Sequence, residues 1–203
     1  MKKMGILLMI SGVLIFSVGC LLWLKEKEGD ELMPEKACVV SDDGTSENAL
    51  NEAEQKGREF ENWVVEHFNR KYFEIIEWRG DKYHKGAYAA SNTYPDLELA
   101  LQLHGKKYDF AVECKYRSQW NGEGVEWADE QNVKNYNEFA KKKNIPVIIV
   151  IGIGGTPCDP ENVFCCPLDK MQYTWAKKAH LEKFRREEKD KSFFYDTEKF
   201  VLK

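Results

Sequence analysis

The sequence lacks the features that would place it in several common protein classes. Its 203 residues contain six cysteines but no C-x2-C pair, so it offers no paired zinc-ligand motif. Internal repeats are absent as well. There is no excess of positive charge, since 30 Lys and Arg residues face 34 Asp and Glu residues and give a net charge of −4. A polycation that coats nucleic acid without specificity is therefore excluded.

The remaining composition is that of a folded protein. Hydrophobic residues make up 43% of the chain and aromatic residues 13%, whereas a disordered chain would lack the aromatics. No disulfide framework is evident in a domain of this size, so buried or free thiols are expected, and these favour the reducing cytoplasmic side of a membrane. The six cysteines are Cys20, Cys38, Cys114, Cys158, Cys165 and Cys166.

The first 24 residues predict a membrane anchor. No charged residue occurs from Met4 to Leu24, and a helix of that length spans about 31 Å, enough for a hydrocarbon core of roughly 30 Å. The alternative is a cleaved signal peptide, but signal h-regions run only about 7–15 residues and no A-x-A-like site follows. We therefore expect a transmembrane anchor at 4–24, a polar linker at 25–46 and a folded domain at 47–203. Basic residues flank the anchor almost equally, so its orientation is not fixed by charge.

The folded domain predicts a mixed α/β fold. The periodicity indicates a helix, three strands, a helix, two strands and a terminal helix, which is a mixed sheet flanked by helices. The uninterrupted apolar run VIIVIGIG is typical of a buried central strand. The expected helices are 47–71, 128–143 and 170–189, and the expected strands are 72–78, 96–103, 108–117, 147–154 and 163–167.

A predicted β-hairpin brings two carboxylates together. The segment DLELALQL from Asp96 places its leucines on one face, and a turn at 104–107 returns the chain into a second alternating strand. Antiparallel pairing then puts Asp96 opposite 113–115, so that Asp96 and Glu113 approach each other on the polar face. Neighbouring strands lie about 4.8 Å apart, so both carboxylates can reach one cation. Mg²⁺ prefers oxygen ligands and keeps several waters, and the backbone carbonyl of Cys114 is a third candidate ligand.

Lys115 completes an acidic–lysine set. It lies two residues after Glu113 and therefore on the same face, where an ammonium can polarise an attacking water or stabilise charge on a phosphate. Charged strand residues often belong to a solvated sheet face. Here, however, Glu113 and Lys115 are interleaved with apolar residues on a strand that a helix is expected to cover, and polar groups on a covered face need a partner or a metal.

These motifs resemble the PD-(D/E)XK nuclease superfamily, which has the restriction-endonuclease-like fold. Pro95-Asp96 and Glu113-Cys114-Lys115 match its signature, and GREFE from Gly57 to Glu61 resembles the G-x-x-x-E of the first helix in resolvase-like members. Tyr116-Arg117 resembles the residues that follow the signature in Holliday junction resolvases and related restriction-type enzymes. The resemblance spans about residues 56–153.

The resemblance implies a Mg²⁺-dependent deoxyribonuclease, with Mn²⁺ as an alternative metal. Asp96 and Glu113 would bind the metal, Lys115 would act on the water, and Glu61 would complete an outer or second metal position. Glu59 competes with Glu61, because it is also acidic and lies two residues away.

Two more residues and the partners also follow from the resemblance. Gln131 would orient phosphate or water from the start of the next helix, and Arg117 would contact nucleic acid. DNA is the implied substrate, RNA is not excluded, and resolvase-like members suggest a homodimer. The alternative of a different class is a catalytically inactive nuclease-like module that binds DNA or protein at the membrane.

Aromatic and basic residues outside these motifs allow two interpretations. Aromatic side chains of the loops pack against the domain or stack on exposed bases. Basic pairs such as Lys177-Lys178 and Arg185-Arg186 are solvated ends or contact phosphates.

Overall fold

The computed structural model describes residues 46–80, 83–84, 87–88 and 93–203. All of these belong to the second of the chain's two units, Lys36–Lys203. The predicted anchor at 4–24 lies outside the described residues, as does the linker up to residue 45. No helix in the described part of the chain is long and apolar enough to cross a membrane.

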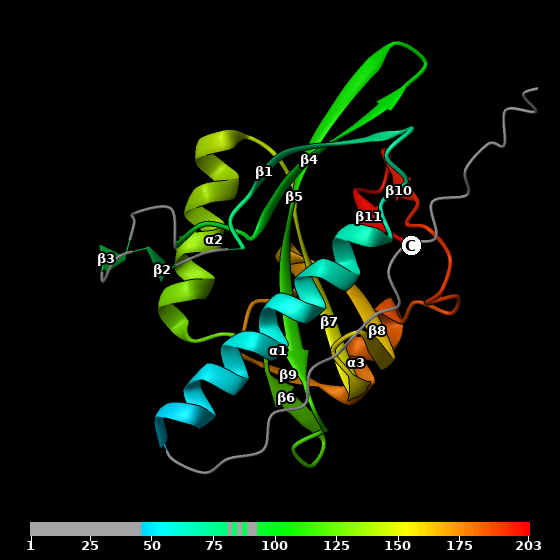
Figure 1. Cartoon of the computed structure of the whole chain (residues 1–203). Coiled ribbons are helices and arrows are strands. Elements are labelled where there is room, and N and C mark those ends of the chain that lie inside the picture. The colour runs from blue at the N-terminus through cyan, green and yellow to red at the C-terminus, as the bar shows by residue number, and fades with distance from the viewer. Residues whose placement is uncertain (1–45, 81–82, 85–86, 89–92) are drawn as a thin grey trace, which may run out of the picture. The chain divides into compact units, whose positions relative to one another are not determined.

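A five-stranded mixed sheet forms the centre of this unit (Figure 1). Its strand order is β1-β4-β5-β7-β8; β5 and β7 are parallel, and the other neighbours are antiparallel. The prediction of a mixed sheet flanked by helices is therefore confirmed. The strands are β1 (Phe73–Trp78), β4 (Leu97–Leu103), β5 (Lys106–Arg117), β7 (Val147–Thr156) and β8 (Asp159–Pro167).

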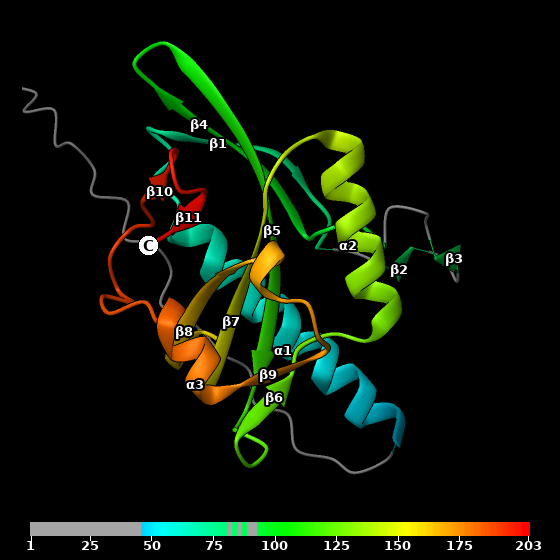
Figure 2. The ribbon, with the colours of Figure 1, turned by 180° about the vertical axis from the view of Figure 1, so that it is seen from behind.

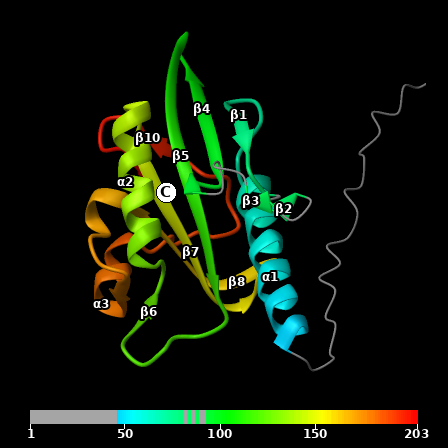
Figure 3. The same ribbon diagram turned by 90° about the vertical axis from the view of Figure 1, so that its left-hand side faces the viewer.

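Two helices cover the two faces of the sheet. Helix α1 (Ser46–Glu66) and helix α2 (Glu130–Lys143) lie on opposite sides of it (Figure 3). Strand alternation produces a separate core on each side, with Phe60 of α1 in one core and Phe139 of α2 in the other. Helix α2 begins where the Asp129 carboxylate accepts the Asn132 N–H at 2.6 Å. The helix ends at Asn144, whose φ of 55° is a left-handed cap.

The hairpin of β4 and β5 has the predicted register. Its pairs run from Leu97 opposite Val112 to Leu103 opposite Lys106. Only His104 and Gly105 form the turn, with φ values of 51° and 73°, which match the left-handed conformations of a two-residue hairpin turn. Strand β5 thus begins at Lys106, two residues earlier than the expected start at 108.

The prediction of a terminal helix at 170–189 is wrong. This segment instead forms β9 (Trp175–Lys177), the one-turn helix α3 (Lys178–Leu181) and the 3₁₀ turn η3 (Glu182–Phe184), after the 3₁₀ turn η2 (Leu168–Lys170). Strand β9 pairs antiparallel with β6 (Gly124–Glu126), and this long-range pairing overrides the local helical pattern. Helix α3 and β6 lie on the same side of the sheet as α2 (Figures 2 and 3).

The structure also differs from the prediction in where helix α1 ends and in four short strands that were not expected. Helix α1 ends at Glu66 rather than at 71, because residues 67–73 form hydrogen-bonded turns that lead into β1. The expected loop at 80–94 contains β2 (Tyr83–His84) and β3 (Ala87–Tyr88). Two further short strands close the chain, β10 (Tyr195–Asp196) and β11 (Val201–Leu202).

Three of the cysteines are free and buried, namely Cys114, Cys165 and Cys166. Burial raises the pKa of the Cys165 thiol to about 12, so this thiol stays protonated and unreactive. Cys158, between β7 and β8, is disulfide-bonded. The expectation of free thiols therefore fails at Cys158, and with it part of the argument for the cytoplasmic side.

Candidate active site

Asp96 and Glu113 lie side by side on adjacent strands. The register of Leu97 with Val112 continues one step to bring Asp96 opposite Glu113, and both side chains are 0% exposed. The backbone N–H of Cys114 donates to Asp96 Oδ2 at 2.8 Å, which holds the aspartate against β5. Two buried carboxylates thus occupy the point where β4 begins.

Lys115 and Tyr136 both contact Glu113. Lys115 Nζ lies 2.5 Å from Glu113 Oε1, and the Tyr136 hydroxyl donates to the same oxygen at 2.6 Å. Burial raises the pKa of Tyr136, and the nearby charges of Glu113 and Asp96 raise it further, so the hydroxyl remains a proton donor. The glutamate is therefore fixed from its own strand and from helix α2.

A break in the sheet opens a pocket next to these residues. Strand β5 continues to Arg117, but β4 pairs with it only as far as Val112. Beyond that point lies a pocket of about 500 Å³, lined by α1 and by the end of β5. Its lining includes Glu61 from the helix and Lys115 from the strand.

The structure distinguishes Glu61 from Glu59. Glu61 is buried, lines the pocket and accepts a long hydrogen bond from Trp78 Nε1 at 3.4 Å. Glu59 instead accepts a hydrogen bond from Gln55 at 2.9 Å and does not line the pocket. Of the two acidic residues, only Glu61 shares a pocket with Lys115.

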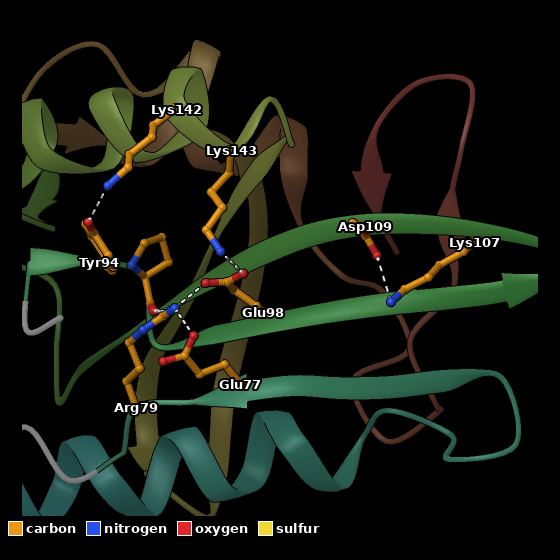
Figure 4. A network of polar contacts seen from close by, with 9 residues as sticks. Glu77, Arg79, Tyr94, Glu98, Lys107, Asp109, Lys142 and Lys143 are labelled. Carbon is orange, nitrogen blue, oxygen red and sulfur yellow. Dashed lines mark hydrogen bonds and ion pairs between the residues drawn. The ribbon is translucent and has the colours of Figure 1, made fainter.

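A buried arginine, Arg79, bonds to the backbone at Pro95 and Asp96, and Figure 4 shows its ion pairs with Glu77 and Glu98. The backbone N–H of Arg79 donates to the Asp96 carbonyl at 2.8 Å, and its Nη1 donates to the Pro95 carbonyl at 2.7 Å. The same guanidinium forms ion pairs with Glu77 and Glu98. Arg79 therefore ties the ends of β1 and β4 together at the candidate site.

Glu98 completes this network on the α2 face of the sheet. Lys143 Nζ lies 3.0 Å from Glu98 Oε2, and Arg79 pairs with the other oxygen. Burial alone would raise the pKa of Glu98, but the hydrogen bonds and charges of Arg79 and Lys143 outweigh it and hold the pKa below its ordinary value. Glu98 is thus an ionised structural partner of Arg79.

Gln131 and Arg117 lie outside this contact network. Gln131 is exposed and donates to Asn135 at 2.8 Å, and no described contact joins it to the carboxylates. Arg117 lines the pocket, but its guanidinium donates to the backbone carbonyls of Tyr116, Glu126 and Trp127. These bonds connect β5 to β6. Its predicted contact with nucleic acid stays a prediction.

The donor set suits a hard divalent cation. No group of three His, Cys, Asp or Glu side chains in the described ranges is close enough to hold a metal ion. Two carboxylates are nevertheless enough for Mg²⁺, which keeps several of its waters. The N–H and C=O of a strand residue point toward the same neighbouring strand, so the Cys114 carbonyl faces the side on which its N–H binds Asp96. Asp96, Glu113 and this carbonyl therefore fit an oxygen-coordinated metal.

Two residues of the site escaped the sequence reasoning. Tyr136 has the spacing of a core residue and its ring is in the core, but its hydroxyl reaches Glu113. Arg79 follows a strand end as an ordinary loop residue would. The sequence offered one signal for each residue. Tyr136 is a polar-tipped residue at an inward position of its helix, and Arg79 is a basic residue at the end of the strand that precedes Pro95-Asp96.

Comparison with known proteins gives a distant structural likeness. No protein-family model and no curated protein matches the chain. Among solved structures, the chain is similar to Hjc, a Holliday junction resolvase from Archaeoglobus fulgidus, at 14% sequence identity and a TM-score of 0.45. The match covers 63% of this chain and 93% of the resolvase. So distant a likeness leaves the function to be argued from the residues of the site.

Proposed function

We propose that this chain is a membrane-anchored PD-(D/E)XK nuclease that hydrolyses DNA phosphodiester bonds with Mg²⁺. The observation that carries the proposal is the buried pair Asp96 and Glu113, with Lys115 bonded to Glu113 at the edge of a pocket. The predicted helix at 4–24 would supply the anchor.

The electrostatics of the pair favour a bound cation. Two carboxylates on adjacent strands in a buried site repel each other, because little water is present to screen their charges. Lys115 supplies a single positive charge. A divalent cation between the carboxylates would offset their repulsion, since the ion becomes the largest charge in the site.

Each residue of the site has a role in phosphodiester hydrolysis. Mg²⁺ held by Asp96, Glu113 and the Cys114 carbonyl would polarise the phosphate and make water a better nucleophile. Lys115 extends from Glu113 to the pocket, where its ammonium can orient the water and stabilise charge on the phosphate. Tyr136 keeps Glu113 in place from the opposite side. Glu61 lines the same pocket, where its carboxylate would bind a second metal ion or a water.

Cleavage by the full-length protein in detergent tests the proposal. Duplex, branched and single-stranded DNA and a matching RNA are incubated with Mg²⁺, with Mn²⁺ and with EDTA. We expect DNA cleavage with either metal and none with EDTA. Glu113→Gln and Lys115→Met should each lower the rate by about 100-fold or more. Glu130→Gln, an exposed glutamate at the start of α2, is the matched control and should cut like the parent.

Metal binding distinguishes this enzyme from an inactive binding module. Calorimetry of the parent should show Mg²⁺ or Mn²⁺ binding that Asp96→Asn removes. A parent that binds DNA but neither binds metal nor cleaves would support the inactive module. Cleavage that persists at the parental rate in both Glu113→Gln and Lys115→Met would refute the proposed site.

Membrane side and oligomeric state need their own tests. A reporter fused after Lys203 that is active on one side of the membrane only would locate the domain. The cytoplasmic side remains our proposal, and the bond at Cys158 is the observation against it. A homodimer would give twice the protomer mass by light scattering after correction for detergent.

A further inference from the structure

A basic segment stands out in this acidic protein. From Lys170 to Arg186 the chain has six basic residues and one acidic residue, whereas the whole sequence has a net charge of −4. This is the segment that forms β9, α3 and η3 in place of the expected helix. Its charge is complementary to a phosphate backbone.

Two aromatic rings project from the same segment. Tyr173 is 77% exposed and Trp175 is 39% exposed. Their backbone is held by Trp127, which is buried: its Nε1 donates to the Tyr173 carbonyl at 2.6 Å, and its N–H donates to the Thr174 carbonyl at 2.9 Å. The rings are therefore exposed on a fixed support, which lowers the entropy that binding would cost.

The aromatic and basic side chains share one surface. On β9, Trp175 and Lys177 point outward while Ala176 is buried between them. The indole lies over Gly124, where an added Cβ would come within 2.6 Å of Trp175 Nε1. Beside the rings is a pocket of about 480 Å³. We call this the β9 surface and define it by Lys170, Tyr173, Trp175, Lys177 and His180. Asp169 lines the same pocket and forms an ion pair with Lys170 at 2.8 Å.

This surface is joined to the strand that carries the candidate catalytic residues. Arg117, two residues after Lys115, donates through Nε to the Glu126 carbonyl at 2.8 Å. Glu126 is the partner of Trp175 in the β6–β9 pair. The β6–β9 pair that carries the β9 surface is therefore bonded to the end of β5, where Arg117 also lines the pocket that contains Lys115.

We propose that the β9 surface binds a single-stranded segment of the DNA substrate, with Tyr173 and Trp175 stacking on unpaired bases. The inference rests on the proposed nuclease function and specifies its substrate as DNA that contains unpaired nucleotides. A duplex hides the faces of its bases, whereas a single strand offers them to aromatic rings, and stacking is independent of sequence. Lys170 and Lys177 lie beside the rings and contact the phosphates on either side.

Binding to an oligonucleotide tests this surface separately from cleavage. Fluorescence anisotropy of labelled oligo(dT) is measured with the full-length protein in detergent and EDTA, so the result does not depend on catalysis. Stacking of one base corresponds to roughly 5- to 150-fold in affinity. We expect Tyr173→Ala with Trp175→Ala to weaken binding at least about tenfold, and Trp175→Phe to retain most of the affinity. Tyr72→Ala removes an exposed aromatic side chain outside the surface and should bind like the parent.

An abasic oligonucleotide of equal length separates stacking from charge. It keeps the phosphates and lacks the bases, so the double variant should bind it as the parent does. Lys177→Gln should instead weaken both ligands and reduce the salt slope by about 0.7. Equal losses for both ligands in the double variant, or no loss for oligo(dT), would overturn the proposal. Tyr173→Ala alone removes a ring that is largely in solvent, so it gives the same test if the double variant does not fold. The proposed nuclease function fails separately, if the parent cleaves no DNA with Mg²⁺ or Mn²⁺.

Discussion

The buried ion pair of Arg79 and Glu98 gives the sharpest prediction about stability. Each side chain is 6% exposed, so Arg79→Met removes the nearer cation from a carboxylate that has little contact with water. Breaking a buried pair on one side costs about 3–5 kcal/mol. Lys143 stays 3.0 Å from Glu98 and offsets part of this loss, so we expect about 3 kcal/mol.

An exposed ion pair on strand β5 supplies the control for this measurement. Lys107 and Asp109 are 3.7 Å apart with side chains 47% and 44% exposed, and Figure 4 also draws this pair. Because water screens such a pair, Lys107→Met should cost less than about 1 kcal/mol. Urea unfolding followed by tryptophan fluorescence gives both free energies on the same protein.

The double variant Arg79→Met with Glu98→Met tests the cause. If the loss comes from an unpaired buried charge, removing both charges should recover more than half of it. If the double variant is as unstable as Arg79→Met, the hydrogen bond to the Pro95 carbonyl, and not the charge of Glu98, accounts for the loss. A cost for Arg79→Met no larger than that for Lys107→Met would refute the reasoning altogether.

Two further predictions concern the same site. Tyr136→Phe removes the donor at 2.6 Å from Glu113, so we expect kcat to fall about 10- to 100-fold, the equivalent of roughly 1–3 kcal/mol, while the affinity for DNA in EDTA is unchanged; an unchanged kcat would show that Tyr136 does not position Glu113. The pKa of Glu98 is held below its ordinary value of 4.5, so its contribution to stability is present above pH 4.5 and is lost as the pH falls through the lowered pKa. Urea midpoints measured from pH 6 to pH 3 should therefore fall less steeply in Glu98→Gln than in the parent, and parallel curves would contradict this assignment.

The sequence predicted the part of the site that depends on strand alternation. The leucines of β4 determine which face of the strand enters the α1 core. Asp96 and Glu98 alternate with these leucines, so the local pattern alone predicts that both acidic side chains point to the other face. A short turn then defines the register, and the register places Asp96 opposite Glu113. Both steps are local and needed no knowledge of the rest of the chain.

The parts that sequence reasoning missed depend on long-range contacts. A bulge between Ile75 and Glu77 shifts the register of β1, so that Trp78 pairs with Leu97 and reaches Glu61 on α1. No local pattern marks that bulge. Strand β9 likewise forms because Gly124 and its neighbours lie beside it, and the sequence from 170 onward carries no sign of that partner.

Pro95 explains why the sheet opens where the carboxylates lie. If the register continued, Pro95 would be the partner of Cys114. The two would form a hydrogen-bonded antiparallel pair, in which each residue donates its N–H to the carbonyl of the other. Proline has no N–H to give to the Cys114 carbonyl, so the ladder between β4 and β5 stops here. The Cys114 N–H turns to the Asp96 carboxylate instead, and the Pro95 carbonyl accepts from Arg79. Because of Pro95, a backbone hydrogen bond between β4 and β5 is replaced by the bond from Cys114 to the Asp96 carboxylate. The Cys114 carbonyl faces the same opening in the sheet.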